Sequence, residues 1–172
     1  MTQTHLPHDA ADATPHHKQT LRLWLRLLGC STLVEKAIRA RLAAEFDTTL
    51  PRFDVMAALE RTPEGLQLGE LSRALLVSNG NVPGIIARLV AEGLVDRRVD
   101  QSDARVARVS LTPAGRAAFL EMAAAHETWV EAMFDGLVES DQEELLTLLT
   151  RLRRSLVKGV EGTATKQHGA RL

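Results

Sequence analysis

Two short helical patterns that follow one another with almost no joint constrain this fold most. Apolar residues recur at helical spacing over residues 69–76 and again over residues 78–92. Helices joined so closely are typical of a helix-turn-helix. The second pattern gathers its apolar residues within about 140° of a helical wheel, namely Val82, Ile85, Ile86, Leu89 and Val90. We expect this arc to face a core.

The opposite face of the second pattern is small and polar rather than densely charged. It consists of Gly80, Asn81, Gly84, Ala87, Arg88 and Ala91. A helix in a DNA major groove needs small residues where its backbone approaches phosphates, and Asn or Arg where a side chain reaches a base edge. Asn81 suits adenine, and Arg88 suits guanine or a phosphate. The same small residues would also suit packing against a neighbouring helix.

Pro83 leaves two starting points for this helix. If Ser78 caps the helix, Pro83 falls in the second turn and one backbone hydrogen bond is lost. If Asn81 caps it, Pro83 lies in the first turn, where proline lacks only a donor that would be unpaired anyway. The helix is then shorter than one that is capped by Ser78.

Two strand-like runs, LVDRRV and RVARVSL, follow Gly93 on either side of DQSDA and predict a two-stranded hairpin. Between Ser72 and Arg116 there are seven arginines against four acidic residues, although the whole chain has a formal net charge of -1. Asp103 could aim the guanidinium of Arg105 into a DNA minor groove, where the negative potential is deep. A solvated salt bridge is the alternative.

Capping signals mark the starts of three further helices. They are Thr48, Thr49 and Pro51; Thr112 and Pro113; and Ser140 with Glu143. With a long helix over residues 17–46, the predicted order is four helices, the hairpin and two helices. Residues 1–16 are expected to form a disordered arm and residues 159–172 a flexible tail.

Composition and motifs exclude several other classes. A chain of 172 residues, 45% hydrophobic and 25% charged, fits one soluble domain. A single cysteine allows no intramolecular disulfide, and the absence of a signal sequence makes the cytoplasm the expected compartment. No phosphate loop, metal-ligand spacing or nucleophile motif indicates an enzyme or a cofactor. The arm's His5, His8, Asp9 and His16 fit a metal site, but also an ordinary solvated tail.

Residues 21–156 resemble MarR-type winged helix-turn-helix transcriptional regulators. GELSRALLVSNGNVPGIIARLVAEGLVDRR is similar to the family's helix-turn-helix, and DQSDARVARVSLTPAGR to its wing, with Asp-x-Arg followed by Leu-Thr-x-x-Gly. The resemblance implies a mainly α fold with a small β-hairpin wing. Residues 17–158 would form a single domain, with a winged helix-turn-helix at 51–112 and dimerisation helices at 17–46 and 113–158.

The resemblance also implies a homodimer on a pseudo-palindromic DNA operator, with recognition helices roughly 34 Å apart. Carried over onto this chain, the DNA-binding residues are Ser78, Asn79, Asn81, Gly84, Arg88, Arg97, Asp103 and Arg105. Pro83 stands where the family is expected to have a threonine or similar donor. That phosphate contact is therefore missing from the pattern.

The effector implied is a small aromatic acid or aromatic acyl-CoA that releases a repressor from its operator. LWLRLLGC, IRARL and TTLPRFDVMAAL resemble a branch that regulates aromatic-acid catabolism, some of whose members respond to acyl-CoA thioesters. The ligand residues implied are Trp24, Leu27, Cys30, Arg39, Arg41, Phe53 and Met56. The two arginines could instead only solvate the first helix. His126, three residues before Trp129, fits either a ligand pocket or the core.

Two other functions stay open. Some family members sense organic peroxides through a cysteine in the first helix, activated by tyrosine hydroxyls, but this chain has Cys30 and no tyrosine. We expect Cys30 to be buried among apolar residues, where a thiol is inert. Alternatively, the winged helix could serve as a protein-interaction adaptor. The positive reading face favours DNA instead.

Overall fold

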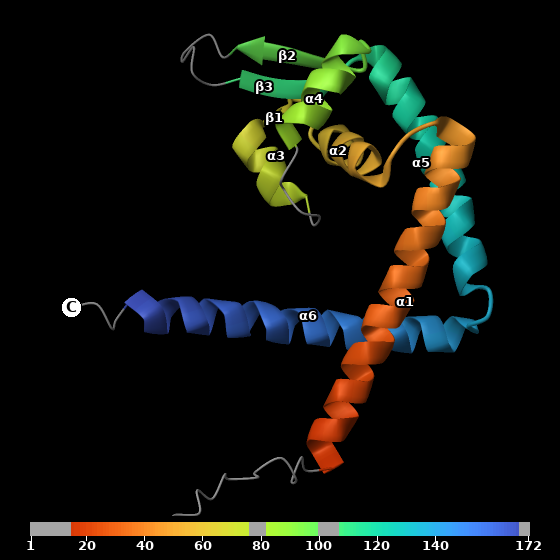
Figure 1. Ribbon diagram of the computed structural model, residues 1–172, viewed down its shortest axis with the longest axis vertical. Coiled ribbons are helices and arrows are strands. Elements are labelled where there is room, and N and C mark those ends of the chain that lie inside the picture. The colour runs from red at the N-terminus through yellow and green to blue at the C-terminus, as the bar shows by residue number, and fades with distance from the viewer. Residues whose placement is uncertain (1–14, 76–81, 100–106, 169–172) are drawn as a thin grey trace, which may run out of the picture. The chain divides into compact units, whose positions relative to one another are not determined.

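The computed structural model describes residues 15–75, 82–99 and 107–168, with the side chains of 17–75, 82–98 and 107–158 (Figure 1). Its elements are α1 (Pro15–Phe46), α2 (Leu50–Glu60), β1 (Leu66–Gln67), α3 (Leu68–Ala74), α4 (Val82–Ala91), β2 (Val95–Val99), β3 (Ala107–Leu111), α5 (Pro113–Phe134) and α6 (Glu139–His168). The predicted mainly helical fold with a small sheet is confirmed. The chain divides into two compact units, Met1–His126 and Glu127–Leu172, which are described separately.

The core of the first unit is built around α2. This helix contacts α1, α3, α4 and β3, and it buries Phe53, Val55, Met56, Ala58 and Leu59. It begins where the sequence predicts, because Thr49 has extended backbone and Pro51 lies in the first turn. The Thr49 side chain makes no capping hydrogen bond. Its backbone carbonyl accepts from the amides of Arg52 and Phe53 and so begins the helical hydrogen bonding.

The sheet has three strands, not the two that the sequence predicts. Its order is β1-β3-β2, and both pairings are antiparallel. β1 is only two residues long, too short for alternation to show. It follows Gly65, whose φ of +87° lets the chain turn. Val109 of β3 is fully buried between its partners Leu66 and Arg97, so this residue fixes the base of the sheet.

The helix-turn-helix is present as α3 and α4, packed beside the sheet in Figure 1. α3 begins with a capping box in which the Gln67 amide donates to Glu70 Oε2 at 2.8 Å. It ends at Ala74, two residues earlier than expected. α4 is described over Val82–Ala91, and the residues that distinguish its two predicted starts, 78–81, lie outside the described residues. Both proposed caps, Ser78 and Asn81, are among them.

The inner face of α4 agrees with the prediction except at one edge. Val82, Ile86 and Leu89 are buried and Ile85 is half-buried, but Val90 is 38% exposed. Val90 lies at the margin of the apolar arc, where solvent reaches it. The helix then stops as predicted at Gly93, whose φ is +73°.

α5 and α6 test the other two capping signals. Thr112 caps α5, since its Oγ1 accepts from the Gly115 amide at 2.9 Å, and α5 ends at Phe134, before Gly136. The predicted Ser140–Glu143 capping box is wrong, because α6 already begins at Glu139. The Val138 carbonyl accepts from the amides of Asp141 and Gln142 at this start, and the Gln142 side chain donates to the carbonyls of Phe134 and Leu137 after α5.

α6 also runs to His168, past the predicted end at residue 158. Its first turn carries Glu139 and Asp141, whose charges suit a helix N-terminus. None of the helices in the described ranges has an apolar stretch that could cross a bilayer.

Candidate nucleic-acid interface

The outward face of α4 is small and carries one cation. Pro83, Ala87, Arg88 and Ala91 are exposed, and Gly84 is half-buried. The Arg88 side chain makes no hydrogen bond or ion pair with another described residue, although its charge acts on the nearby Glu92 carboxylate. Three predicted DNA-binding residues, Ser78, Asn79 and Asn81, lie outside the described residues. The described part of α4 therefore offers a backbone that can approach a phosphate closely, and one guanidinium free to bind an anion or a base edge.

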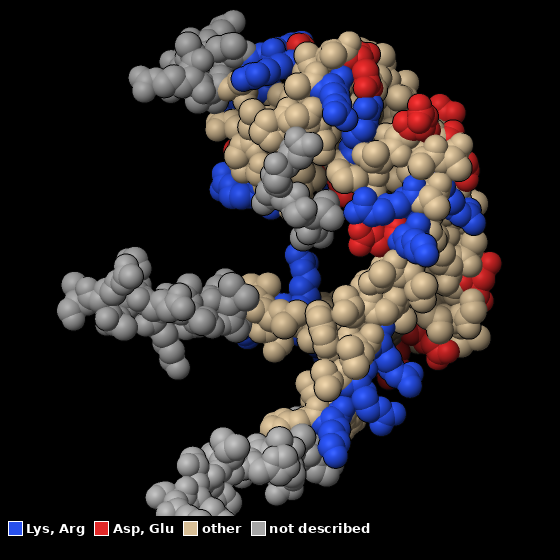
Figure 2. Space-filling view, in the orientation of Figure 1, with Lys and Arg blue, Asp and Glu red and all other residues tan. Residues whose placement is uncertain are grey.

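Arg97 of β2 supplies a second free guanidinium. It is exposed, and among the described residues it has no hydrogen-bond or ion-pair partner. As the partner of Val109 in the β2–β3 register, it lies on the same side of the sheet as Val95. β2 contacts α4, so Arg88 and Arg97 lie on neighbouring elements. Basic side chains, drawn in blue, lie over β2 in Figure 2, and this segment of the chain contains arginine but no lysine. Asp103 and Arg105 lie outside the described residues.

Most of the other arginines of this segment bind the scaffold instead. Arg108 Nη1 donates to the Gly65 carbonyl at 3.1 Å, and Arg116 Nε donates to Glu60 Oε1 at 2.9 Å. Arg98 Nε donates to Asp96 Oδ2 at 2.8 Å. Arg108 and Arg116 are thus bound to more distant parts of the unit, whereas Arg98 is paired only with its strand neighbour and its side chain stays 80% exposed.

The Leu-Thr-x-x-Gly motif has a structural role at the base of the wing. Thr112 Oγ1 donates to the Gly93 carbonyl at 2.7 Å, and the Thr112 amide donates to the Leu94 carbonyl at 3.1 Å. Gly115 lies against the same strand stem, since a Cβ there would be 1.9 Å from the Leu94 carbonyl oxygen. The motif thus joins the start of α5 to the residues that connect α4 and β2.

An ion pair between Arg52 and Glu92 was not predicted from the sequence. Arg52 Nη1 donates to Glu92 Oε1 at 2.8 Å, and Nη2 donates to Oε2, so the pair is bidentate. This hydrogen bonding lowers the pKa of the Glu92 carboxyl and raises the pKa of the Arg52 guanidinium. The two residues are 40 positions apart, and no local pattern connects them.

The predicted ligand residues fall into a buried and an exposed group. Phe53 and Met56 are core residues of α2. The Phe53 ring stacks on the His126 ring with centroids 4.9 Å apart, and burial lowers the pKa of that imidazole. His126 therefore packs on the core, one of its two predicted environments.

The exposed group lies on α1. Trp24 is 55% exposed, Cys30 and Arg41 are exposed, and Leu27 is half-buried. The expectation that Cys30 is buried is wrong for this chain, because the surrounding stretch of α1 has no covering element among the described residues of its unit. Arg39 is bound twice by Glu35 Oε1, through Nε at 2.9 Å and Nη2 at 2.6 Å.

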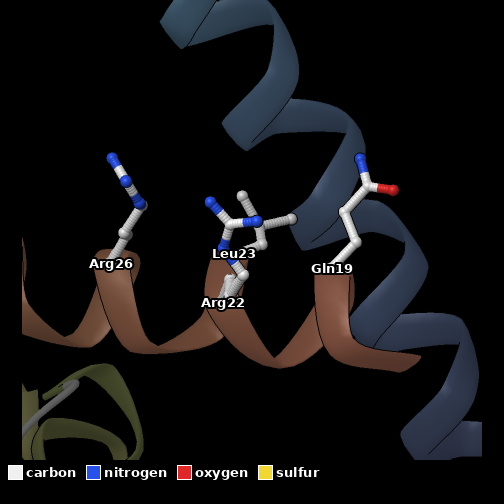
Figure 3. Close-up of a pocket in the computed structure, with 4 residues that line it drawn as sticks. All are labelled: Gln19, Arg22, Leu23 and Arg26. Atoms are coloured by element: carbon white, nitrogen blue, oxygen red, sulfur yellow. The ribbon is translucent and has the colours of Figure 1, made fainter. Parts of the chain in front are cut away.

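A shallow hollow on α1 contains none of the predicted ligand residues. It is lined by Gln19, Arg22, Leu23 and Arg26, whose side chains project from the same side of the helix in Figure 3. The described residues contain no cluster of three or more His, Cys, Asp or Glu that could hold a metal ion. The side chains of His5, His8, Asp9 and His16 lie outside the described part.

The architecture, with two short helices beside a three-stranded sheet, defines a winged helix-turn-helix protein. A model of the MarR family matches residues 46–106. The crystal structure of a MarR family transcriptional regulator from Silicibacter pomeroyi is 33% identical with a TM-score of 0.71, over 83% of this chain and 99% of that one. The chain therefore belongs to the MarR family and is a DNA-binding transcriptional regulator, not an enzyme.

Two further relatives are informative. The transcriptional activatory protein BadR of Rhodopseudomonas palustris is 35% identical over 97 residues, which is 55% of each chain. This chain thus matches about half the length of BadR. BpsR of Bordetella bronchiseptica is 28% identical with a TM-score of 0.65, over 74% of this chain and 96% of that one. Its structure concerns regulation of DNA binding by 6-hydroxynicotinic acid.

Proposed function

We propose that this protein is a homodimeric repressor of a pseudo-palindromic operator, released by a small aromatic acid or aromatic acyl-CoA. The outward face of α4 carries the proposal, because it exposes Ala87, Arg88 and Ala91 while the opposite face is buried. Such a surface suits a major groove. Of the predicted contacts, Gly84 and Arg88 lie on α4 and Arg97 on β2.

The remaining predicted contacts complete the proposed DNA surface. Ser78, Asn79 and Asn81 precede α4 in the chain, and Asp103 and Arg105 lie between β2 and β3. In this proposal the residues before α4 reach bases and phosphates of the major groove. Arg105, aimed by Asp103, enters the adjacent minor groove.

Exposed apolar side chains on α1 and α6 support the homodimer. They are Leu21, Leu23, Trp24, Leu25, Leu28 and Leu33 on α1, and Leu145, Leu146, Leu148, Leu149, Leu156 and Val157 on α6. On each helix, an exposed apolar surface of this kind is typical of an interface, and its burial stabilises an assembly by about 25 cal/mol per Å². An identical copy of the chain is the partner that the family resemblance implies.

The effector class has support from one relative. The compound said to regulate DNA binding by BpsR, 6-hydroxynicotinic acid, is an aromatic acid. In this chain Arg39 and Arg41 would meet the carboxylate or phosphate groups of such a ligand, while Trp24, Leu27, Cys30, Phe53 and Met56 would contact its apolar part. Arg39 would have to leave Glu35 to do so.

The mechanism proposed is a shift between two spacings of the recognition helices. The unliganded dimer fits the operator, and the ligand favours a spacing that fits it poorly. A ligand moves this equilibrium only through its differential affinity for the two states, so a 100-fold weakening of DNA binding needs about 2.7 kcal/mol of coupling.

Selection of duplexes from a randomised pool, followed by fluorescence anisotropy with the selected duplex, tests DNA recognition. Arg88→Ala should weaken binding of that duplex by about tenfold, the cost of one lost base contact. Arg26→Ala, which removes an exposed arginine of α1, is the matched control and should bind as wild type. Failure of the wild-type chain to enrich any sequence would overturn the proposal and favour a protein-interaction adaptor.

Thermal-shift screening tests the effector. Aromatic acids and their CoA thioesters that bind only the folded chain should raise its melting temperature. Active compounds should also release the selected duplex. If neither group of compounds raises the melting temperature or releases the selected duplex, the proposed effector class is wrong.

A redox response through Cys30 is the second candidate; Cys30 is exposed in the single chain, between Leu28 and Leu33, which the proposed homodimer would bury. An accessible thiol can react with a peroxide, whereas a buried one cannot. Release of the duplex by an organic peroxide in the wild-type chain, absent in Cys30→Ser, would support this function. Peroxide-insensitive binding in both proteins would exclude it.

A further inference from the structure

Both ends of α2 are tied by ion pairs to residues that flank the wing. At the N-terminal end, Arg52 binds Glu92 in the bidentate pair already described. At the C-terminal end, Glu60 Oε1 accepts from Arg116 Nη2 at 2.7 Å and from Nε at 2.9 Å. Glu92 lies between α4 and β2, and Arg116 lies in the first turn of α5, just after β3. The two stems of the wing are thus both attached to the same core helix.

The charges of Arg52 and Glu92 do not suit their own helices. Arg52 lies in the first turn of α2, where the helix dipole disfavours a cation, and Glu92 follows the last turn of α4, where it disfavours an anion. The largest compensation for each charge is the other, across the gap between the two helices, with smaller contributions from Asp47 to Arg52 and from Arg88 to Glu92. The pair therefore favours one particular approach of the α4 C-terminus to the α2 N-terminus.

Glu92 lies where the chain passes from α4 to β2, the two elements that carry the proposed DNA contacts Arg88 and Arg97. The Glu92 amide still donates to Arg88 of α4, Gly93 turns the chain with positive φ, and β2 begins at Val95. On the other side, Thr112 holds the carbonyls of Gly93 and Leu94. A shift at Glu92 would therefore turn α4 relative to the wing.

We propose that Arg52 and Glu92 are positioning residues for DNA recognition, which fix the orientation of α4 relative to the wing without contacting DNA. This inference rests on the proposed function. The side chain of Arg52 is 21% exposed and both terminal nitrogens of its guanidinium are bound to Glu92, so it is not available to a phosphate. The pair limits how far α4 can turn, and α4 carries the base contacts.

A positioning role and a purely stabilising role predict different changes. Phosphate contacts tolerate a small rotation of a helix, whereas base contacts do not, because the base edges lie deeper and demand specific geometry. Loss of positioning should thus lower affinity for a preferred sequence and spare affinity for an arbitrary one. Loss of stability would lower the folded fraction and both affinities together.

The experiment compares Glu92→Gln, Arg52→Met and the double variant in the full chain. The probes are a duplex selected from a randomised pool by the wild-type chain, and an unrelated duplex of the same length. Glu92→Gln should bind the selected duplex about tenfold more weakly, the cost of one lost base contact, with no loss of affinity for the unrelated duplex. The double variant should lose less than the product of the two single losses, because the residues act through one another.

Glu35→Gln is the matched control. Glu35 also accepts two bonds from one arginine, Arg39, but both residues lie on α1. Its removal should leave both affinities unchanged. Melting temperatures measured on all variants show whether each is folded at the assay temperature.

The outcomes separate the inference from the function on which it rests. Wild-type-like binding of the selected duplex by Glu92→Gln, or a parallel loss for both duplexes, overturns the positioning role while sequence-specific binding by the wild-type chain stands. A tenfold loss in Glu35→Gln also overturns it. If the wild-type chain enriches no sequence at all, the proposed function fails first and the inference fails with it.

Discussion

Replacing Gly115 by alanine should destabilise the winged helix-turn-helix because there is no room for a side chain. A Cβ at this position would lie 1.9 Å from the Leu94 carbonyl oxygen and 2.7 Å from the Leu94 carbonyl carbon. These atoms belong to the backbone, so no rotamer change relieves the clash. α5 would have to move away from the stem of β2 by more than 1 Å, roughly the difference from an ordinary contact distance.

The size of the loss follows from two terms. Overpacking of a closed site costs about 1–3 kcal/mol. Displacing α5 also strains the bonds from Thr112 to Gly93 and Leu94, and the loss of one adds about 0.5–1.5 kcal/mol. We therefore expect the free energy of unfolding to fall by about 2–4 kcal/mol. At about 3 °C per kcal/mol for a chain of this size, the melting temperature should fall by roughly 6–12 °C.

Urea unfolding followed by circular dichroism, at one fixed protein concentration, measures this loss. The concentration must be fixed because dimerisation would add to apparent stability. Gly69→Ala is the matched control, since its added Cβ meets nothing within 4 Å on α3. It should lose no stability. A Gly115→Ala variant within about 0.5 kcal/mol of wild type, the usual range of neutral surface changes, would refute this account of the motif.

Three further predictions concern single residues. Arg105→Ala should weaken operator binding by well over tenfold and lower the salt slope; unchanged affinity in a gel-shift titration would rule out its role in the wing. Cys30→Ser should keep ligand-dependent release, and loss of a peroxide-induced release in that variant would favour redox sensing instead. Burial holds the pKa of His126 below its usual 6.5. As the pH drops through about 6.5, the unfolded chain is therefore protonated at His126 before the folded chain is, and the free energy of unfolding should fall. His126→Phe should reduce that fall in melting temperature between about pH 7.5 and 5.5; an equal fall in both proteins would contradict it.

The sequence predicted features whose causes are local. Thr112 and Pro113 start α5 and Gly93 ends α4, because a capping hydroxyl, a fixed φ and a positive φ act within one turn. The Ser140 signal failed for a related reason. Several nearby groups can accept from the first amides of a helix, and here the Val138 carbonyl accepts from the amides of Asp141 and Gln142.

Features with distant causes were missed. β1 has too few residues to show alternation and is recognised only through its pairing with Val109. The Arg52–Glu92 pair depends on how α2 meets α4, which no window of sequence contains. In the candidate DNA surface, the small face of α4 was predictable from spacing alone. The hydrogen bond from Arg108 to the Gly65 carbonyl was not predictable, because the two residues are 43 positions apart in the chain.

The pairing of β1 with β3 has a consequence for how this chain folds. Gly65 and Arg108, which meet at this pairing, are 43 positions apart, and all of α3, α4 and β2 lies between them. Closing so long a loop has an entropic cost that β1 and β3 recover only when the enclosed helices also pack. The reading helix should therefore form in the same cooperative step as the wing. A fragment that ends at Gly93 lacks β3 and should remain largely unfolded in circular dichroism.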